Sequence, residues 1–311
     1  MFNKIQELLR IKAEQQAKLK LIPYIGSVEI KDIGEKKYLY VRNRVASKNT
    51  STYVGLYSEE LYITLLRQVK KAREIKKFIR KLEKELAILG YTETELSNNV
   101  ILNLDFARAN MKSIIYDQAI LEGVATTFPD TELIIDNGKI NNVKTEDVLK
   151  IINLKHAWEF VLDKDVISSP SSYYLSQYIA KLVNEGFYYD GGKIRSVPVT
   201  IKGSSYIPNI PIESVIKDDI DSILKREIDD IDKAIELALY IMKTQIFIDG
   251  NKRTGIIFAN HYLISKGKGL LVVPYDLVDQ FKKLLVSYYE GKDIDTIKNF
   301  FKEKCLRKLS L

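Results

Sequence analysis

Residues 245–256 are Gln-Ile-Phe-Ile-Asp-Gly-Asn-Lys-Arg-Thr-Gly-Ile, and the rest of the chain is organised around this stretch. Before it, apolar residues recur at three- and four-residue steps from Ile231 to Met242, which predicts a helix. The Asp-Gly pair predicts a turn, and Asn251 is suited to be the N-cap of a second helix. Lys252 and Arg253 would then lie in that helix's first turn, where its dipole disfavours each cation by about 0.3–1 kcal/mol.

Two interpretations of these cations are open. A bound anion would accept hydrogen bonds from the free N–H groups of the first helical turn, while Lys252 and Arg253 closed around it. Asp249, just ahead of the helix, would then hold the hard divalent cation that accompanies phosphates. In the other interpretation the corner is structural and its charges point into water.

The stretch resembles the signature loop of Fic-domain proteins (the Fic/Doc or Fido family), His-x-Phe-x-Asp/Glu-Gly-Asn-x-Arg-x-x-Arg. Five residues fall on this pattern: Phe247, Asp249, Gly250, Asn251 and Arg253. Two positions depart from it, because Gln245 stands where the family has its catalytic histidine and Ile256 where it commonly has a second arginine. Lys252 matches the Lys-Arg-Thr variant of Doc-like and other Fic branches. The resemblance therefore favours the fold, while the departures bear on the activity.

The resemblance implies a protein adenylyltransferase that moves AMP from ATP to a Ser, Thr or Tyr hydroxyl of a protein. Asp249 would hold Mg²⁺, Phe247 would anchor the loop, and the residues that cradle the phosphates would be Gly250, Asn251, Lys252 and Arg253. A glutamine amide is not a base, and loss of a general base costs about 10²–10⁴ in rate. We therefore expect a slow or altered enzyme in which Gln245, Asn251 and Arg253 carry the catalysis that remains. The alternatives are an inactive Fic-like module that binds a nucleotide and a partner protein, and a Doc-like phosphotransferase.

Glu122-Gly123 is similar to the inhibitory segment of the family, Ser/Thr-x-x-x-Glu-Gly/Asn, although Gln118 replaces the hydroxyl residue. In the family this glutamate pairs with the second arginine of the signature loop and blocks placement of the γ-phosphate. Since that arginine is absent, Glu122 would meet Lys252 or Arg253 instead and limit nucleotide access. The other interpretation is an exposed acid at a helix end.

Two alternating runs on either side of Gly203, within residues 197–208, predict a β-hairpin. It resembles the flap that covers the active site of Fic proteins, and an exposed flap edge can hold a target segment as an added strand. The flap residues expected to bind a target are Val199, Thr200, Ile201, Gly203, Ser204 and Ser205. Without the signature loop, a structural hairpin would be the preferred interpretation.

The N-terminal part has a different pattern. We expect a charged helix over 3–20, a β-hairpin with strands at 37–42 and 51–55, and a long helix over 59–89. This helix carries a dense set of Lys and Arg, with Glu74 and Glu83 as expected acidic partners. Its basic face is more typical of solvated surface than of a nucleic-acid site, which stays the minority interpretation. Further helices are predicted over 106–125, over 145–163 with Thr145 as the N-cap, over 174–185 and over 281–289.

We therefore expect a mainly α protein, with an N-terminal extension over 1–95 and a Fic-like helical bundle over 96–311. The net charge of +7 is mild, and the single cysteine excludes a disulfide framework. Neither histidine has a second ligand at metal-binding spacing, so no zinc site is expected. No apolar run is long enough to cross a bilayer and the N-terminus lacks a signal-peptide core, which favours the cytoplasm. The expected ligands are ATP and Mg²⁺ and the expected partner is a protein docking on the flap, with a homodimer left open.

Overall fold

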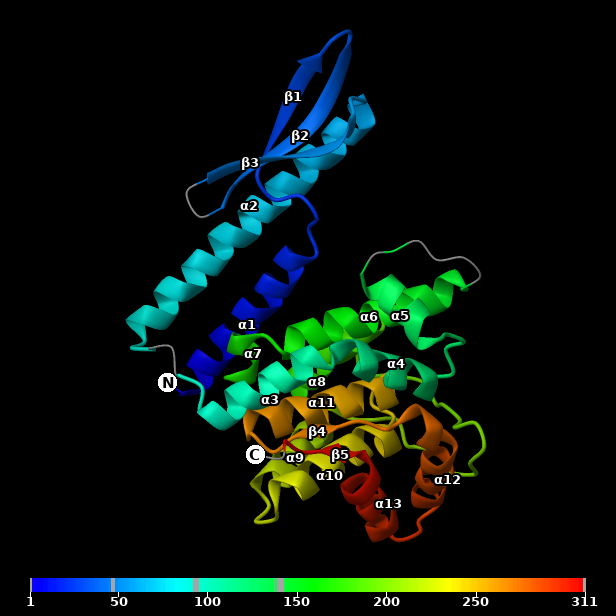
Figure 1. Ribbon diagram of the computed structural model, residues 1–311. Helices are drawn as coiled ribbons and strands as arrows, with labels where there is room; N and C mark the ends of the chain where they lie inside the picture. Colours follow the sequence, from blue (N-terminus) through cyan, green and yellow to red (C-terminus); the bar gives the residue numbers. More distant parts are fainter. Residues whose placement is uncertain (1, 46–47, 92–94, 137, 139–142, 310–311) are drawn as a thin grey trace. The chain divides into compact units, whose positions relative to one another are not determined.

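The structure is a computed structural model that describes residues 2–45, 48–91, 95–136, 138 and 143–309. The chain divides into two compact units, residues 1–93 and 94–311 (Figure 1). The boundary expected from the sequence, after residue 95, lies two residues away. Each unit has its own core and is described separately below. No helix in the described ranges is long and apolar enough to span a membrane.

The first unit is a helical pair with a three-stranded sheet. Its elements are α1 (Phe2–Lys20), β1 (Ser27–Ile33), β2 (Lys36–Val45), β3 (Lys48–Leu56) and α2 (Glu59–Ile88). The sheet is antiparallel in the order β1-β2-β3, and pairs such as Arg42 with Ser51 form the predicted hairpin. The hairpin turn at residues 46–47 lies outside the described residues. The first strand was not predicted, and it pairs with β2 from Ser27 to Ile33.

The core of this unit follows the helical period of α2. One side of α2 is buried at three- and four-residue steps, by Leu65, Val69, Ala72, Ile75, Ile79, Leu82 and Leu86. Near the end of α2, Leu82 and Leu86 pack on Leu8 and Leu9 of α1. Near its start, Leu65 packs under Leu39 and Val41 of β2. Because one stripe of α2 supplies the contacts to both partners, its opposite side faces solvent.

The second unit is built from helices, as predicted. Its elements are α3 (Asn98–Ala109), α4 (Met111–Leu121), α5 (Phe128–Ile135), α6 (Thr145–Val161), α7 (Lys164–Ile167), α8 (Tyr173–Val183), α9 (Glu213–Lys225), α10 (Asp230–Thr244), α11 (Asn251–Ser265), β4 (Leu270–Leu271), a 3₁₀ turn (Tyr275–Leu277), α12 (Val278–Tyr289), α13 (Ile294–Phe300), a π turn (Phe301–Cys305) and β5 (Leu306–Arg307). Helix α11 is central and contacts α3, α6, α8 and α10 (Figure 1). From Arg253 to Ile264 each of its residues is buried. The buried central helix of this unit, α11, therefore begins inside residues 245–256.

Several predicted element ends are wrong by short distances. The predicted helix over 106–125 is two helices that break at Asn110, whose side chain donates to the carbonyl of Phe106 at 2.8 Å. Thr145 is the first residue of α6, and Lys144 occupies the N-cap without a side-chain bond. The N-cap of α11 is Gly250, and Asn251 is its first residue.

The predicted flap contains a turn but no strands. Residues 195–212 include no regular strand, and the N–H of Ser204 donates to the carbonyl of Ile201 at 3.1 Å to close the turn. Pro198 and Pro208 lack the N–H that a ladder position needs, which explains why the two arms do not pair. The arms are held by other contacts, described below.

Candidate functional site

The turn between α10 and α11 is held in one conformation by side chains. Gln245 ends α10 in the left-handed region, with φ 49° and ψ 58°, and is the one non-glycine residue with positive φ among those described. Such a conformation is uncommon without glycine and has to be stabilised by neighbours. The Gln245 amide donates from Nε2 to the carbonyl of Met242 at 2.6 Å and accepts at Oε1 from Asn251 Nδ2 at 3.2 Å. Both ends of this amide are therefore engaged inside the turn.

Asn251 braces the loop instead of capping the helix. Its Oδ1 accepts from the N–H of Phe247 at 3.0 Å, and its Nδ2 donates to the Phe247 carbonyl at 2.7 Å. The Phe247 ring is fully buried, and the backbone of Phe247 forms an antiparallel bridge with Ile194. The loop is thus anchored by the buried ring of Phe247 and by Asn251, which hydrogen-bonds to both the N–H and the carbonyl of Phe247.

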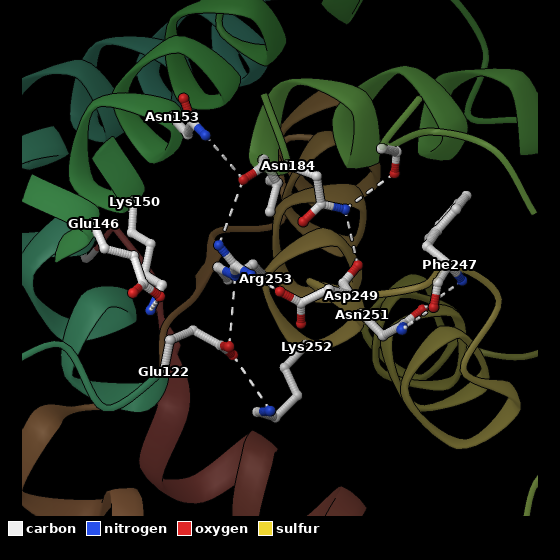
Figure 2. Close-up of polar contacts among 12 residues, drawn as sticks. Glu122, Glu146, Lys150, Asn153, Asn184, Phe247, Asp249, Asn251, Lys252 and Arg253 are labelled. Carbon is white, nitrogen blue, oxygen red and sulfur yellow. Dashed lines mark hydrogen bonds and ion pairs between the residues drawn. The ribbon is translucent and has the colours of Figure 1, made fainter. Parts of the chain in front are cut away.

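Position 250 requires glycine for two reasons, its backbone conformation and the lack of space for a Cβ atom. Its φ is 72°, and a Cβ there would lie 2.8 Å from Val183 Cγ1 and 2.9 Å from Asn184 Oδ1. Asn184 is itself buried and donates to the carbonyls of Asp249 at 2.9 Å and Gly191 at 3.0 Å (Figure 2). Asn184 was not recognised from the sequence, because a lone asparagine after a helix gives no signal of a contact 65 residues away.

The two cations of the first turn of α11 share one carboxylate. Glu122 Oε1 lies 3.5 Å from Lys252 Nζ, and Glu122 Oε2 lies 3.5 Å from Arg253 Nε (Figure 2). Arg253 Nη2 also pairs with Asp249 Oδ2 at 3.2 Å, and Nη1 donates to the carbonyl of Val183 at 3.4 Å. Burial alone would raise the pKa of Glu122, but the charges of Lys252 and Arg253 outweigh it and lower that pKa. Glu122 is therefore ionised at neutral pH and contacts both of the residues expected from the sequence.

The start of α11 keeps hydrogen-bonding capacity for an anion. The first main-chain N–H of α11 that is bonded is that of Thr254, which donates to the carbonyl of Gly250 at 2.8 Å. Within the described part of the chain, the N–H groups of Asn251, Lys252 and Arg253 have no hydrogen-bond partner. Arg253 Nε is buried and also lacks a hydrogen bond, since Glu122 lies beside it without a bonded geometry. Together with the helix dipole, these unbonded donors are chemically suited to an anion.

Glu122 is held in place by the end of α4. Gly123 follows it at φ 76°, and the N–H of Val124 returns to the carbonyl of Ala119 at 3.0 Å, so the helix closes with a left-handed glycine. Gln118, one turn earlier, donates to the carbonyl of Arg253 at 3.0 Å and accepts from the indole of Trp158 at 2.9 Å. The residue that replaces the family's hydroxyl thus ties α4 directly to α11.

The flap tip is attached to the end of α12. Glu290 Oε1 accepts from Ser204 Oγ at 3.1 Å and from the N–H of Ser205 at 2.9 Å. The ring of Tyr206 stacks on Tyr289 with centroids 6.2 Å apart. The remaining flap residues named from the sequence, Val199, Thr200, Ile201 and Gly203, lie in the arm and turn that precede these contacts.

The base of the flap is joined to Gln245 by Arg195, which sequence reasoning missed. Arg195 is 3% exposed and donates to five carbonyls, those of Val197, Pro208, Asn209, Thr244 and Gln245. It has no acidic partner in the described part of the chain, and its burial lowers its pKa. A cation at the end of α10 is favourable for the helix dipole. No local pattern in the sequence marks an arginine whose acceptors come from three separate segments.

The buried histidine of α11 takes no part in this site. His261 Nε2 lies 2.8 Å from the carbonyl of Val166, and Nδ1 lies 2.9 Å from Ser171 Oγ. Burial lowers its pKa to about 4, so the ring is neutral near pH 7. His261 therefore links α11 to the α7 segment and does not replace the missing base.

Asp249 is the residue of this site that is suited to a divalent cation. The Asp249 side chain is 49% exposed, and Arg253 contacts only its Oδ2. A carboxylate oxygen beside an anion site is suited to Mg²⁺, which takes one or two protein carboxylates together with phosphate oxygens.

Comparisons with known proteins find similarity to one family. Residues 172–263 match the model of the Fic/DOC family. Fic-1 (residues 134–508) from C. elegans is 18% identical, with a TM-score of 0.53 over 79% of this chain and 73% of that one. A Fic-domain-containing signaling protein from Bacteroides thetaiotaomicron VPI-5482 is 16% identical, with a TM-score of 0.54 over 70% and 89%. A Fic family protein from Desulfovibrio desulfuricans G20 is 13% identical, with a TM-score of 0.51 over 68% and 74%. No curated protein matches the chain significantly.

Proposed function

We propose that this protein, of which residues 172–263 match the model of the Fic/DOC family, transfers AMP from Mg-ATP to a Ser, Thr or Tyr hydroxyl of another protein, at a reduced rate. The observation that carries the proposal is the anion site at the start of α11. Free N–H groups, a buried arginine and a half-buried lysine converge on one helix end, and nucleotide phosphates match that site in charge and in hydrogen bonding.

Each residue of the loop has a distinct task in this proposal. Lys252 and Arg253 neutralise phosphate charge, and Asn251 keeps the loop in the conformation that exposes the N–H groups. Asp249 would hold Mg²⁺, which when bound neutralises charge on the phosphates. Positioning and charge neutralisation supply most of the catalysis of phosphoryl transfer, and both are available here.

Gln245 determines the rate. In the transfer, the acceptor oxygen bonds to the α-phosphorus, the bond from that phosphorus to the bridging oxygen breaks, and pyrophosphate leaves. The hydroxyl proton must go to solvent or to a phosphate oxygen, since an amide does not accept it. Gln245 Oε1 already accepts one bond from Asn251 and keeps a second lone pair, with which it can orient the acceptor hydroxyl. We expect a rate about 10²–10⁴ below that of a histidine-bearing enzyme.

Glu122 is proposed to limit nucleotide access. Its carboxylate contacts Lys252 and Arg253, so an incoming phosphate has to displace it or bind against its charge. The acceptor protein is proposed to dock as an extended segment along residues 199–203, where main-chain groups of the flap are unpaired within the described structure apart from the turn bond of Ile201.

One observation favours a second candidate, a module that binds a nucleotide and a partner without catalysis. The Gln245 amide is bonded at both ends inside its own turn, to Met242 and Asn251, which reduces its availability to a substrate. A Doc-like phosphotransferase would use the same site to transfer the γ-phosphate. Transfer of the α-label, of the γ-label or of neither by the native chain separates the three candidates.

The test is transfer of label from ATP carrying ³²P at the α- or the γ-phosphate to proteins of a lysate. The native chain, Gln245→His and Asn251→Ala are compared. We expect slow α-label transfer by the native chain, faster transfer by Gln245→His and none by Asn251→Ala. Label from the γ-position alone would indicate a phosphotransferase. Silence of the native chain with an active Gln245→His variant would favour the binding module, and silence of all three with both labels would overturn the proposed transfer.

A further inference from the structure

Helix α2 carries one surface that the signature loop does not explain. We define its basic face as the exposed Lys and Arg residues on the side opposite the buried stripe: Arg67, Lys70, Lys71, Arg73, Lys76, Lys77, Arg80, Lys81 and Lys84. Residues 67–81 contain eight cations and one carboxylate, a net charge of +7 that equals that of the whole chain. The charge excess of this protein is therefore concentrated on one side of one helix.

The acidic partners expected from the sequence are not there. Glu83 pairs with Lys12 of α1 at 3.8 Å, and Glu74 forms no ion pair among the residues described. Of the basic face, only Lys81 has an ion-pair partner in the described structure, Glu85 at 3.9 Å. The other eight cations have no ion-pair partner among the described residues of this unit, so their charge is available to an external anion.

The arrangement of these cations is unfavourable without an external anion. Like charges four residues apart on a helix repel each other. Five such pairs lie along the basic face: Arg67 with Lys71, Arg73 with Lys77, Lys76 with Arg80, Lys77 with Lys81, and Arg80 with Lys84. A bound polyanion would relieve this repulsion along the whole face.

We propose that the basic face of α2 binds the phosphate backbone of a nucleic acid, without sequence preference. Lys70, Arg73, Lys77, Lys81 and Lys84 follow steps of three and four residues, so they form one row about 21 Å long at 1.5 Å rise per residue. Duplex DNA presents about six phosphates per strand over that length, which matches a regular row of cations. The row is four lysines and one arginine, which are residues that contact phosphates, and it contains no Asn, Gln, Asp or Glu of the kind that reads adenine or cytosine edges.

A membrane fits this face less well. An interfacial helix binds by inserting an apolar stripe into the lipid, and in α2 that stripe is occupied by α1 and the sheet. The exposed large apolar residues of α2 are Ile63, Leu66, Phe78 and Ile88, and of these only Phe78 lies between the first and last cations of the basic face. The proposal is independent of the transfer activity, because none of these residues belongs to the loop at Gln245.

The experiment measures binding of the full chain to labelled 25-base-pair duplex DNA and to single-stranded RNA by fluorescence anisotropy, from 25 to 300 mM salt. The test variant changes Lys70, Arg73, Lys77 and Lys81 to Gln. The matched control removes the same charge from four exposed lysines of the second unit, Lys225, Lys268, Lys283 and Lys304. Circular dichroism checks that both variants keep their helices.

We expect the native chain to bind with a dissociation constant on the order of 10⁻⁶–10⁻⁴ M near physiological salt. Its log–log salt slope should be about −4 to −5 on duplex DNA, as for about five phosphate contacts. The test variant should lose most of the affinity and about three to four units of slope, while the control variant should change little. Preference for duplex or single strand identifies the source of the phosphates.

Three outcomes would overturn the proposal. The first is that neither nucleic acid binds at 50 mM salt. The second is that the test and control variants lose the same affinity for nucleic acid. The third uses vesicles of 30% phosphatidylserine as an additional ligand, and is that the chain binds the vesicles alone. Equal losses would mean that overall charge, and not the row on α2, attracts the polyanion.

Discussion

Two clusters of cations in this protein are built in opposite ways. At the start of α11, Arg253 is 2% exposed and lies between two carboxylates, Glu122 and Asp249. On α2, the basic face is exposed and eight of its nine cations have no ion-pair partner among the described residues. Burial makes each contact of the first cluster specific and costly to remove. In the second cluster the cations are exposed, so their contributions to binding an anionic ligand should add, should be screened by salt and should depend little on the geometry of that ligand.

The largest expected difference is in stability. Arg253→Met should lower the free energy of unfolding by about 3–5 kcal/mol, because it removes the buried one of the two cations that compensate the charge of buried Glu122. Lys77→Met on the basic face should change it by at most about 0.5 kcal/mol. Urea denaturation of the two variants beside the native chain measures both values. Similar losses in the two would mean that the α11 cluster is not the rigid, paired site described here.

Arg195 tests a third arrangement, a buried cation with carbonyl partners alone. Arg195→Met should destabilise the protein by about 1–3 kcal/mol, since it leaves buried carbonyls unsatisfied. Adding Arg195→Met to the Gln245→His variant tests whether Arg195 also positions Gln245 and the flap. If Arg195 has that role, the added change should lower kcat/KM for the acceptor protein and leave the ATP affinity nearly unchanged. Arg195→Lys, which keeps the charge but not the five-carbonyl pattern, is the matched control for charge. Equal loss of ATP affinity and acceptor use would indicate a general structural role instead.

How far the sequence predicted these arrangements depends on how local they are. The loop itself was predictable, because the turn and the two cations of α11 lie within nine residues of Gln245. The contact of Glu122 with both cations was predictable only through the family resemblance. The structure adds what depends on distant segments: Asn184 under Gly250, Gln118 on the carbonyl of Arg253, and the absence of strands in a flap with two prolines. For α2 the basic residues were evident, but the expected neutralisation by Glu83 was wrong, because that carboxylate pairs with α1.

Nucleotide affinity should respond to the charge of Glu122. We expect Glu122→Gln, which keeps the shape of the side chain, to lower the ATP dissociation constant about 5- to 150-fold, the range of a coupling free energy of about 1–3 kcal/mol. Glu122→Gly should have an effect at least as large. Isothermal titration in the presence of Mg²⁺ measures these constants, and an unchanged value in both variants would remove the regulatory role.

The pH dependence sharpens this test. The pKa of Glu122 is lowered in the folded protein, so its contacts with Lys252 and Arg253 are complete above the ordinary carboxyl pKa and are lost only as the pH falls through the lowered value. The ratio of ATP dissociation constants between the native chain and Glu122→Gln should therefore be constant from about pH 6 to 8 and narrow only below about pH 4. A ratio that changes near pH 6–7 would assign the effect to another group.

The smallest expected effect comes from reversing one charge of the basic face. Lys77 lies four residues from both Arg73 and Lys81, so Lys77→Glu converts two repulsive pairs into attractive ones. Each repulsive pair that is lost and each attractive pair that is gained contributes about 0.2–0.5 kcal/mol. The free energy of unfolding should therefore rise by about 1 kcal/mol at low salt. Urea denaturation at 20 and 500 mM salt should show the gain at the lower concentration and little of it at the higher one. The same variant should bind DNA more weakly, which pairs a gain in stability with a loss of binding. A loss of stability at low salt would mean that the cations of α2 are already neutralised within the protein, and the contrast with α11 would then disappear.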